Sequence, residues 1–168
     1  SPNPMRLAVS RDLRVWTCRG EVLDVGEPSA RDPNIMEQNG QLAVIYLKGD
    51  SICMRWSDDM IQYGEEQTLY TGRPGVAMES PILKRIHGWY YLFYCIFDPN
   101  DIINGAYDYR TFVHAAPTLD ELQGSPCVAR INAHAPELFQ DERGDWYIAS
   151  VEWPHRGVNI ARIGWKDA

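Results

Sequence analysis

The segment "ARDPNIMEQNGQLAVIYL", residues 30–47, recurs twice later in the chain in related form. The second copy is "MESPILKRIHGWYYLFYC" at residues 78–95, and the third is "AHAPELFQDERGDWYIAS" at residues 133–150. Each copy has a proline, an aliphatic residue two positions later, and then a glycine that opens an apolar or aromatic run. This order is typical of a strand that follows a tight hairpin. The matching residues are Pro33, Ile35 and Gly40, then Pro81, Leu83 and Gly88, then Pro136, Leu138 and Gly144.

A second element precedes each of these copies. "SRDLRVW" at residues 10–16 and "SDDMIQY" at residues 57–63 share a Ser, an Asp two positions later, an aliphatic residue three later and an aromatic residue six later. A degenerate third copy, "APTLDEL", covers residues 116–122. From the start of each copy to the next repeat proline there are 23, 24 and 20 residues, so the two elements stay in phase. The chain therefore contains an internal repeat.

The repeat unit has the character of a small antiparallel sheet. Its segments are short, β-branched or aromatic, and separated by Gly, Asn and Asp turns. A unit of about four strands and a period of roughly 40 to 50 residues are typical of a β-propeller blade, which must pack on its neighbours. We therefore predict one all-β domain over residues 1–168, a partial β-propeller of about three four-stranded antiparallel blades. The predicted blades cover 30–77, 78–132 and 133–168, and residues 1–29 supply the outer strands of a preceding blade.

The composition is that of an ordinary globular domain of 168 residues, with 45% hydrophobic and 23% charged residues. The formal net charge of −7 argues against a nucleic-acid-binding protein, because such proteins contact phosphates with basic residues. No run approaches about 18 apolar residues and no signal peptide is visible. We therefore expect no membrane span and favour a cytoplasmic location, with the native N-terminus left open.

The cysteines and histidines do not form a recognisable metal motif. Cys18, Cys53, Cys95 and Cys127 contain no Cys-x-x-Cys pair, which argues against a zinc or redox site. Cys53 and Cys95 lie in apolar runs, where we expect free buried thiols. The acidic stretch 98–108 does not match a calcium-binding loop. We therefore expect no metal and no cofactor.

Two carboxylates stand at the starts of the first and second repeat copies. Asp32 directly precedes Pro33, and Glu79 stands two residues before Pro81. The inner strands of propeller blades are related by rotation about one axis, so both side chains should face the same end of the central channel. Glycoside hydrolysis needs such a pair, because one carboxyl group gives a proton while the other stays ionised as nucleophile, base or stabiliser. Glu137, one residue after the third repeat proline, is a further candidate.

These motifs resemble those of a known group of enzymes. Arg31-Asp32-Pro33 resembles the Arg-Asp-Pro motif of the five-bladed propeller glycoside hydrolases of families 32 and 68, to which family 43 is similar. Glu79-Ser80-Pro81 is similar to their Glu-x-Pro element, and "HAPELF" at 134–139 resembles a strand start common in family 43. The Ser-x-Asp-Leu-x-x-Trp pattern resembles their outer strands. The resemblance implies Glu79 as the general acid/base and Asp32 as the transition-state stabiliser. It implies that Arg31 positions a sugar hydroxyl or the carboxylates.

The resemblance also implies a third carboxylate, the nucleophile or base, on the first strand of the first blade. The sequence shows neither that strand nor a closing blade. Five blades need roughly 250 residues, and 168 are present. The chain could be part of a longer enzyme, could close a ring with another chain, or could be a degenerate relative that only binds. Because an open propeller exposes the apolar faces of its terminal blades, we favour a homo-oligomer or a companion chain that completes the propeller.

Aromatic residues near the Asp32 end predict a carbohydrate ligand. Tyr107 lies in the long connection 97–110 of the middle unit, and Trp153 lies in its counterpart in the third unit. Aromatic faces beside carboxylates suit the C–H surfaces and hydroxyl groups of a sugar. His134 is a further candidate for binding substrate near the axis, with a purely structural histidine as the plainer explanation.

Each candidate has a structural explanation as well as a functional one. Asp32 could simply accept backbone N–H groups ahead of Pro33, and Glu137 could be an ordinary polar residue. We predict a glycoside hydrolase-like protein that cleaves, or at least binds, a glycosidic linkage. The alternative is a non-catalytic carbohydrate-binding or assembly module that kept the architecture without the strand for the nucleophile or base.

Overall fold

A computed structural model describes residues 4–97, 110–152 and 157–165. These residues form thirteen β-strands and one short 3-10 helix. The elements are β1 Met5–Val9, β2 Thr17–Leu23, β3 Arg31–Gln38, β4 Gln41–Lys48, β5 Ser51–Ser57, β6 Gln67–Thr71, β7 Ala77–Ile86, β8 Trp89–Phe97, β9 Thr111–Ala116, η1 Leu122–Gly124, β10 Cys127–Ile131, β11 His134–Gln140, β12 Trp146–Glu152 and β13 Gly157–Ile163.

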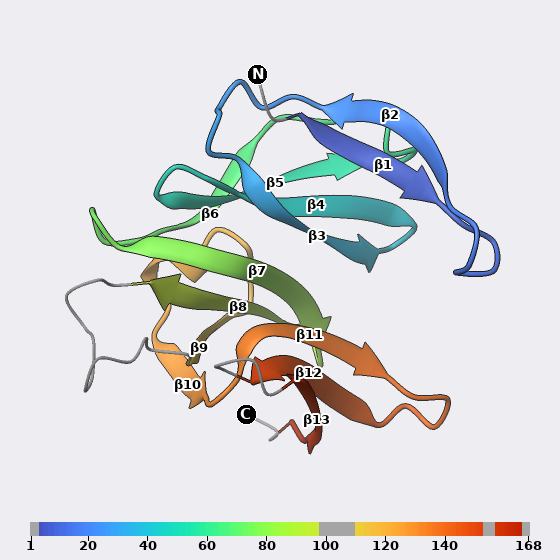
Figure 1. Ribbon diagram of the computed structural model, residues 1–168. Coiled ribbons are helices and arrows are strands. Elements are labelled where there is room, and N and C mark those ends of the chain that lie inside the picture. The colour runs from blue at the N-terminus through green and yellow to red at the C-terminus, as the bar shows by residue number, and fades with distance from the viewer. Residues whose placement is uncertain (1–3, 98–109, 153–156, 166–168) are drawn as a thin grey trace.

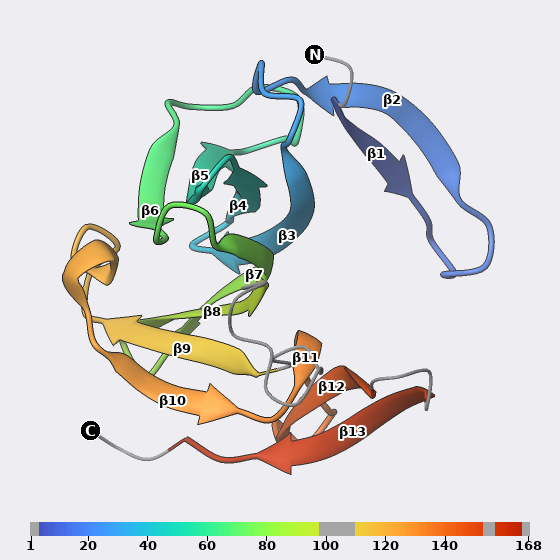
Figure 2. The ribbon, with the colours of Figure 1, turned by 60° about the vertical axis from the view of Figure 1, so that its left-hand side comes forward.

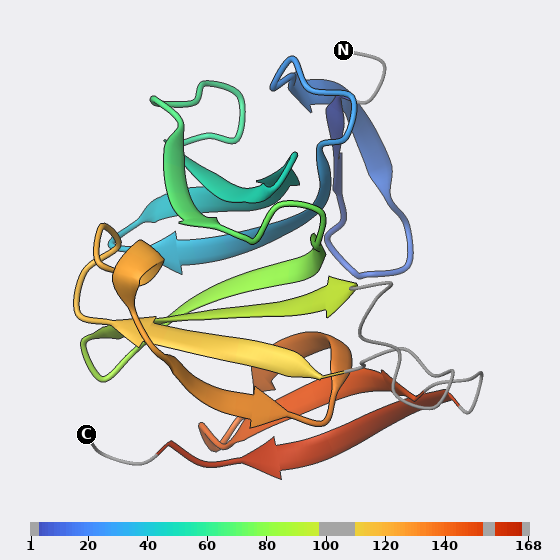
Figure 3. The same cartoon turned by 90° about the vertical axis from the view of Figure 1, so that its left-hand side faces the viewer.

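The strands form four antiparallel sheets, each built from consecutive strands (Figure 1). The first sheet is β1–β2, the second β3–β6, the third β7–β10 and the fourth β11–β13. The second, third and fourth sheets stack one on another (Figure 3), and they fan out from a side on which β7 contacts both β3 and β11 (Figure 2). The predicted all-β fold of packed antiparallel blades, present as part of a propeller, is confirmed.

The inner strands β3, β7 and β11 share one local distortion. The residue before the repeat proline has a positive φ in each strand, 54° at Asp32, 51° at Ser80 and 47° at Ala135. The pairing register shifts at the same place in all three strands. Because the following proline has no N–H to give to the ladder, the pairing is interrupted there and the strand bulges. The repeated proline therefore marks a repeated bulge.

The predicted tight hairpins after the bulges are present in the first and second copies, whereas the third copy has a longer turn between Gln140 and Trp146. Asn39 and Gly40 have φ values of 53° and 81°, and His87 and Gly88 have 49° and 87°. Two consecutive residues with positive φ are the requirement of a two-residue turn that matches the twist of its flanking strands. These turns carry the chain directly from β3 to β4 and from β7 to β8.

The apolar core lies between the faces of adjacent sheets. Between the second and third sheets, Ile45, Leu47, Leu83 and Leu92 are fully buried. Burying each such side chain stabilises the fold by about 1.5 to 3 kcal/mol. Smaller clusters join the third sheet to the fourth through Ile82, Phe93, Val113 and Leu138, and the first sheet to the second through Leu23, Val44, Tyr46 and Cys53.

The sheets at the two ends of the stack have fewer strands than the two sheets between them. Within the described residues, the first sheet has two strands and the fourth has three. On β13, Ile163 packs toward the third sheet, whereas Val158 and Ile160 point to the opposite face and are 68% and 64% exposed. The fourth sheet therefore exposes apolar side chains on the face that a further sheet would cover.

Two other features follow the sequence. Cys53 and Cys95 are buried and form no disulfide, as predicted, while Cys18 and Cys127 are exposed. Across residues 4–97, 110–152 and 157–165 there is no helix long and apolar enough to cross a membrane.

Candidate functional site

The bulges determine the positions of the candidate side chains on the inner strands. Arg31, Glu79 and His134 occupy the first bulge position of β3, β7 and β11, two residues before each proline. Asp32 occupies the second position, which Ser80 and Ala135 hold in the other strands. Asp32 and Glu79 therefore stand at neighbouring, not equivalent, positions of the bulges in β3 and β7, since Ser80 and not Glu79 has the positive φ in β7.

Arg31 and Asp32 both bond to the next inner strand. The backbone N–H of Ser80 donates to Oδ2 of Asp32 at 3.0 Å, and Nη2 of Arg31 donates to the carbonyl oxygen of Met78 at 2.7 Å. Nε of Arg31 also lies 3.8 Å from Oδ2 of Asp32. The Asp32 carboxylate thus receives a hydrogen-bond donor and a nearby positive charge. Its side chain is still 34% exposed, so it remains accessible from solvent.

Glu79 lies beside His134 of the following inner strand. Nε2 of His134 is 3.8 Å from Oε2 of Glu79, and the two side chains are 15% and 29% exposed. Burial lowers the pKa of His134, and the negative charge of Glu79 partly opposes that effect. The pair is an ion pair only when the imidazole is protonated. At neutral pH the arrangement is a half-buried carboxyl group beside a neutral imidazole.

A matching pair of bonds, which the sequence did not predict, joins the third sheet to the fourth. The backbone N–H of Ala135 donates to Sγ of Cys95 at 3.3 Å, and Oγ1 of Thr111 donates to the carbonyl oxygen of Ala133 at 2.6 Å. Ala135 and Ala133 correspond to Ser80 and Met78 of the previous junction. At both junctions the same two backbone groups are bonded, but by different side chains. The feature that the two junctions share is therefore the bulge and not a residue type.

The remaining candidates separate into two groups. Glu137 is exposed, and its charge acts on Lys84 of β7, where it partly opposes the lowering of the Lys84 pKa by burial. A substrate role for Glu137 stays a prediction. Tyr107 and Trp153 lie outside the described residues. The described part of the chain contains no cluster of three or more His, Cys, Asp or Glu residues that could hold a metal ion.

Comparisons with known proteins give a result at the level of structure. No protein-family model matches the sequence, and no curated protein matches it. A thermostable family-43 glycoside hydrolase superposes with a TM-score of 0.70 at 16% identity, over 98% of this chain and 64% of that chain. An endo-arabinase from Bacteroides thetaiotaomicron gives 0.68 at 14% identity, over 90% of this chain and 62% of that one.

A third neighbour is an exo-β-1,3-galactanase from Phanerochaete chrysosporium, with a TM-score of 0.63 at 12% identity over 79% of this chain and 35% of that chain. The chain thus spans about a third of the galactanase and less than two thirds of the other two proteins. At these identities the likeness concerns the fold. The predicted resemblance is confirmed at that level, and the chain has the fold of part of a family-43 glycoside hydrolase propeller.

Proposed function

We propose that this chain carries the acid/base part of a glycoside hydrolase-type site and binds a carbohydrate at the bulged ends of β3, β7 and β11. The observation that carries the proposal is that Asp32 accepts a hydrogen bond from Ser80, the neighbour of Glu79, and that Glu79 lies 3.8 Å from His134, with all three side chains only partly buried. Two carboxyl groups with different partners at one end of a propeller are suited to a reaction that needs one proton donor and one anion.

The proposed roles follow from the partners of each group. Glu79 gives its proton to the glycosidic oxygen as the bond to the sugar breaks, with His134 holding the carboxyl group in place. Asp32 stays ionised between the Ser80 N–H and the Arg31 guanidinium, and its charge stabilises the positive centre that develops on the sugar ring. The aromatic residues Tyr107 and Trp153, together with Glu137, are proposed to line the sugar.

The catalytic form of this proposal needs a third carboxylate. The rotation from β11 to β7 to β3 continues toward the first sheet, whose described residues form only β1 and β2. The third carboxylate would therefore stand on the side of β3 away from β7, and it would come from a further part of the polypeptide or from another chain.

A non-catalytic carbohydrate-binding module is the second candidate, and one observation favours it. Arg31 and Asp32 both bond to the backbone of β7, a role that joins two sheets without any chemistry. Under this alternative the bulged ends bind sugar and Glu79 has no proton to transfer.

Turnover and binding separate the two candidates. The chain is tested with β-1,3-galacto-oligosaccharides and arabino-oligosaccharides, because a galactanase and an arabinase are among its structural neighbours. Product release is followed by chromatography, and affinity is measured by calorimetry. We expect Glu79→Gln to lower turnover at least a hundredfold, about the share general acid catalysis supplies, while the matched exposed control Glu142→Gln keeps it. Unchanged turnover in Glu79→Gln and Asp32→Asn would refute the catalytic roles. Affinity without turnover, in an assembly that also supplies the third carboxylate, would support the binding module.

A further inference from the structure

Three turn segments precede the last strand of their sheets, and they do not have the same surroundings. We call residues 10–16, 57–63 and 116–122 the turn segments. They connect β1 to β2, β5 to β6, and β9 through η1 to β10. In the sequence they are copies of one element. A shared role is therefore expected of them.

The second and third turn segments seal the junctions between sheets. Met60 and Tyr63 pack against the cluster that joins the first sheet to the second. In the third segment, Leu122 is fully buried and Leu119 packs beside it, against the cluster that joins the second sheet to the third. The third segment is also bonded across this junction, since Gln67 donates to Asp120 at 2.8 Å.

The first turn segment has the same local structure as the second. Asp12 accepts the backbone N–H groups of the residues two and three positions later at 2.9 Å, and Asp59 does the same at 2.8 Å. The residue directly after each aspartate has a positive φ, 58° at Leu13 and 60° at Met60. Yet Leu13 is 78% exposed and Trp16, the counterpart of Tyr63, is 56% exposed. The turn is formed, but within the described residues no sheet face covers its apolar side chains.

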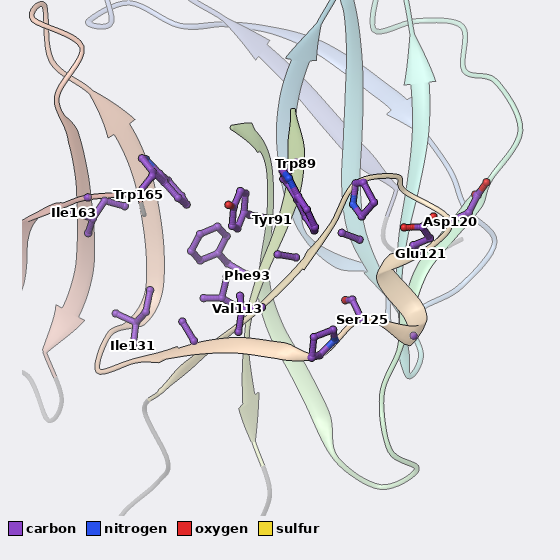
Figure 4. A pocket seen from close by; sticks show the side chains of 18 residues that line it. Trp89, Tyr91, Phe93, Val113, Asp120, Glu121, Ser125, Ile131, Ile163 and Trp165 are labelled. Atoms are coloured by element: carbon purple, nitrogen blue, oxygen red, sulfur yellow. The ribbon is translucent and has the colours of Figure 1, made fainter. Parts of the chain in front are cut away.

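The junction between the third and fourth sheets shows the opposite situation. In the third sheet, the turn segment begins at Ala116, which pairs with Tyr90. In the fourth sheet, Ile163 pairs with Trp146 at the corresponding place, so a turn segment of this sheet would begin at Ile163. The described residues of this sheet continue only to Trp165. An open groove of about 1140 Å³ lies along this junction (Figure 4). Its apolar lining includes Tyr91, Phe93, Val113, Val128, Ile131 and Trp165.

The charges around the groove complement those of the first turn segment. Asp120 and Glu121 lie at one end of the groove (Figure 4). The first turn segment carries two exposed arginines, Arg11 and Arg14, and the other two segments carry no basic residue. The exposed apolar residues Leu13 and Trp16 thus lie near positive charges, while the groove has negative charges at one end. Such complementarity favours one mode of docking over others.

We propose that the first turn segment of one copy of this chain docks into the groove between the third and fourth sheets of a second copy. Leu13 and Trp16 enter the groove as Leu119 and Leu122 enter the junction before it. The segment and the groove are different surfaces of one chain, so the contact is head-to-tail, and its smallest closed form is a dimer with two equivalent junctions.

The mass of the full chain in solution tests this proposal. Light scattering over a concentration series should give twice the 19.2 kDa of one chain, or a larger closed species. The segment variant is Leu13→Ser with Trp16→Ser, and the groove variant is Val128→Asp, at a position that is 52% exposed. Ile61→Ser, in the second turn segment and 69% exposed, is the matched control. Circular dichroism checks that each variant is folded.

We expect both variants to weaken association about thirtyfold or more, the effect of losing a strong interface residue, and the control to leave it unchanged. A mixture of the segment variant and the groove variant should associate again through the one intact junction that the pair retains. A monomer at all concentrations would overturn the proposal. So would an assembly that depends on Val128 but not on Leu13 and Trp16, because the groove would then have another occupant. None of these readouts involves a sugar, so they are independent of the proposed function.

Discussion

The carboxylate of Asp32 on β3 accepts a 3.0 Å hydrogen bond from the backbone N–H of Ser80 on β7. One residue therefore joins two neighbouring inner strands at the end where the candidate site lies. This relationship gives Asp32 a structural role whatever its chemistry is. Experiments at this position have to measure stability beside activity.

Replacing Asp32 with alanine should destabilise the fold modestly. The substitution leaves the Ser80 N–H without its acceptor and keeps a Cβ at a φ of 54°, a conformation that Asp and Asn tolerate better than Ala. Because the site is partly exposed, we expect Asp32→Ala to lower the free energy of unfolding by about 1 to 2 kcal/mol. Urea denaturation measures the change.

Two further variants at this position separate the causes. Asp32→Asn keeps an acceptor oxygen and the tolerance for positive φ, and it should cost less than about 1 kcal/mol. Asp32→Gly removes the acceptor but relieves the backbone. Full stability of Asp32→Ala would show that the hydrogen bond to Ser80 contributes nothing measurable.

The hydroxyl group of Thr111 should matter at the next junction. It donates to the carbonyl oxygen of Ala133 at 2.6 Å, and both residues are buried. Thr111→Val keeps the shape of the side chain but leaves that carbonyl unsatisfied, which costs about 1 to 3 kcal/mol. Chemical denaturation of the variant and of Thr111→Ser, which retains the hydroxyl, measures the effect. A Thr111→Val variant as stable as the unmodified chain would contradict a stabilising role of this hydrogen bond.

The Glu66 carboxylate should contribute stability that acid removes. Tyr46 and Lys48 each donate to it at 2.7 Å, and Arg55 lies 3.6 Å away. Burial alone would raise the pKa of Glu66, but these partners outweigh burial and lower it from 4.5. Because the folded pKa is the lower one, this stability is complete above pH 4.5 and is lost as the pH falls through the folded value.

Denaturation midpoints measured between neutral and acidic pH check this expectation. We expect Glu66→Gln to lower the free energy of unfolding by about 1 to 2 kcal/mol at neutral pH and to flatten the acid dependence. The exposed neighbour Glu65→Gln is the control. An acid dependence equal to that of the unmodified chain would contradict the assignment to Glu66.

The imidazole of His134 should report the charge of Glu79. Burial lowers the pKa of His134 below 6.5, and Glu79 raises it in part. We therefore expect Glu79→Gln to lower the pKa of His134 further. A pH titration followed by NMR measures it, with His134→Gln to assign the signal and Glu142→Gln as the control. A pKa that does not move would mean that the two groups do not interact in solution.

The same shift predicts a pH dependence of stability. A folded pKa below the ordinary 6.5 means that the unfolded chain takes up the proton more readily. Buried His114, whose pKa is lowered by burial and partly restored by the carbonyl group of Ser125, acts in the same direction. The free energy of unfolding should therefore be constant above pH 6.5 and decrease as the pH falls toward the folded pKa values. The His134→Gln variant should lose part of that decrease in urea titrations.

The bulge shows where the sequence stops being informative about the site. The proline of Arg31-Asp32-Pro33 predicts an interruption of pairing, because proline lacks an N–H. The aligned prolines also place Asp32, Ser80 and Ala135 at one position, with Arg31, Glu79 and His134 at the position before it, but they do not predict the positive φ of the residue that precedes each proline.

Bonds between sheets were beyond the sequence for a similar reason. Cys95 and Thr111 bond to β11 from the strands β8 and β9, whereas Arg31 and Asp32 make the equivalent bonds from β3. Different residue types on different strands serve the same backbone groups. Because the residue types differ between the two junctions, no recurring sequence pattern predicts these bonds.

The sequence alone determined the repeat, the antiparallel strands and the tight hairpins after β3 and β7, because alternation, prolines and glycines act over a few residues. The tertiary structure alone decided that Asp32 holds Ser80, that Glu79 meets His134, and that Leu13 and Trp16 stay exposed while Leu119 and Leu122 pack between sheets. The reason is physical. Local conformation depends on nearest neighbours in the chain, whereas contacts between sheets depend on which faces the folded stack brings together and which it leaves uncovered.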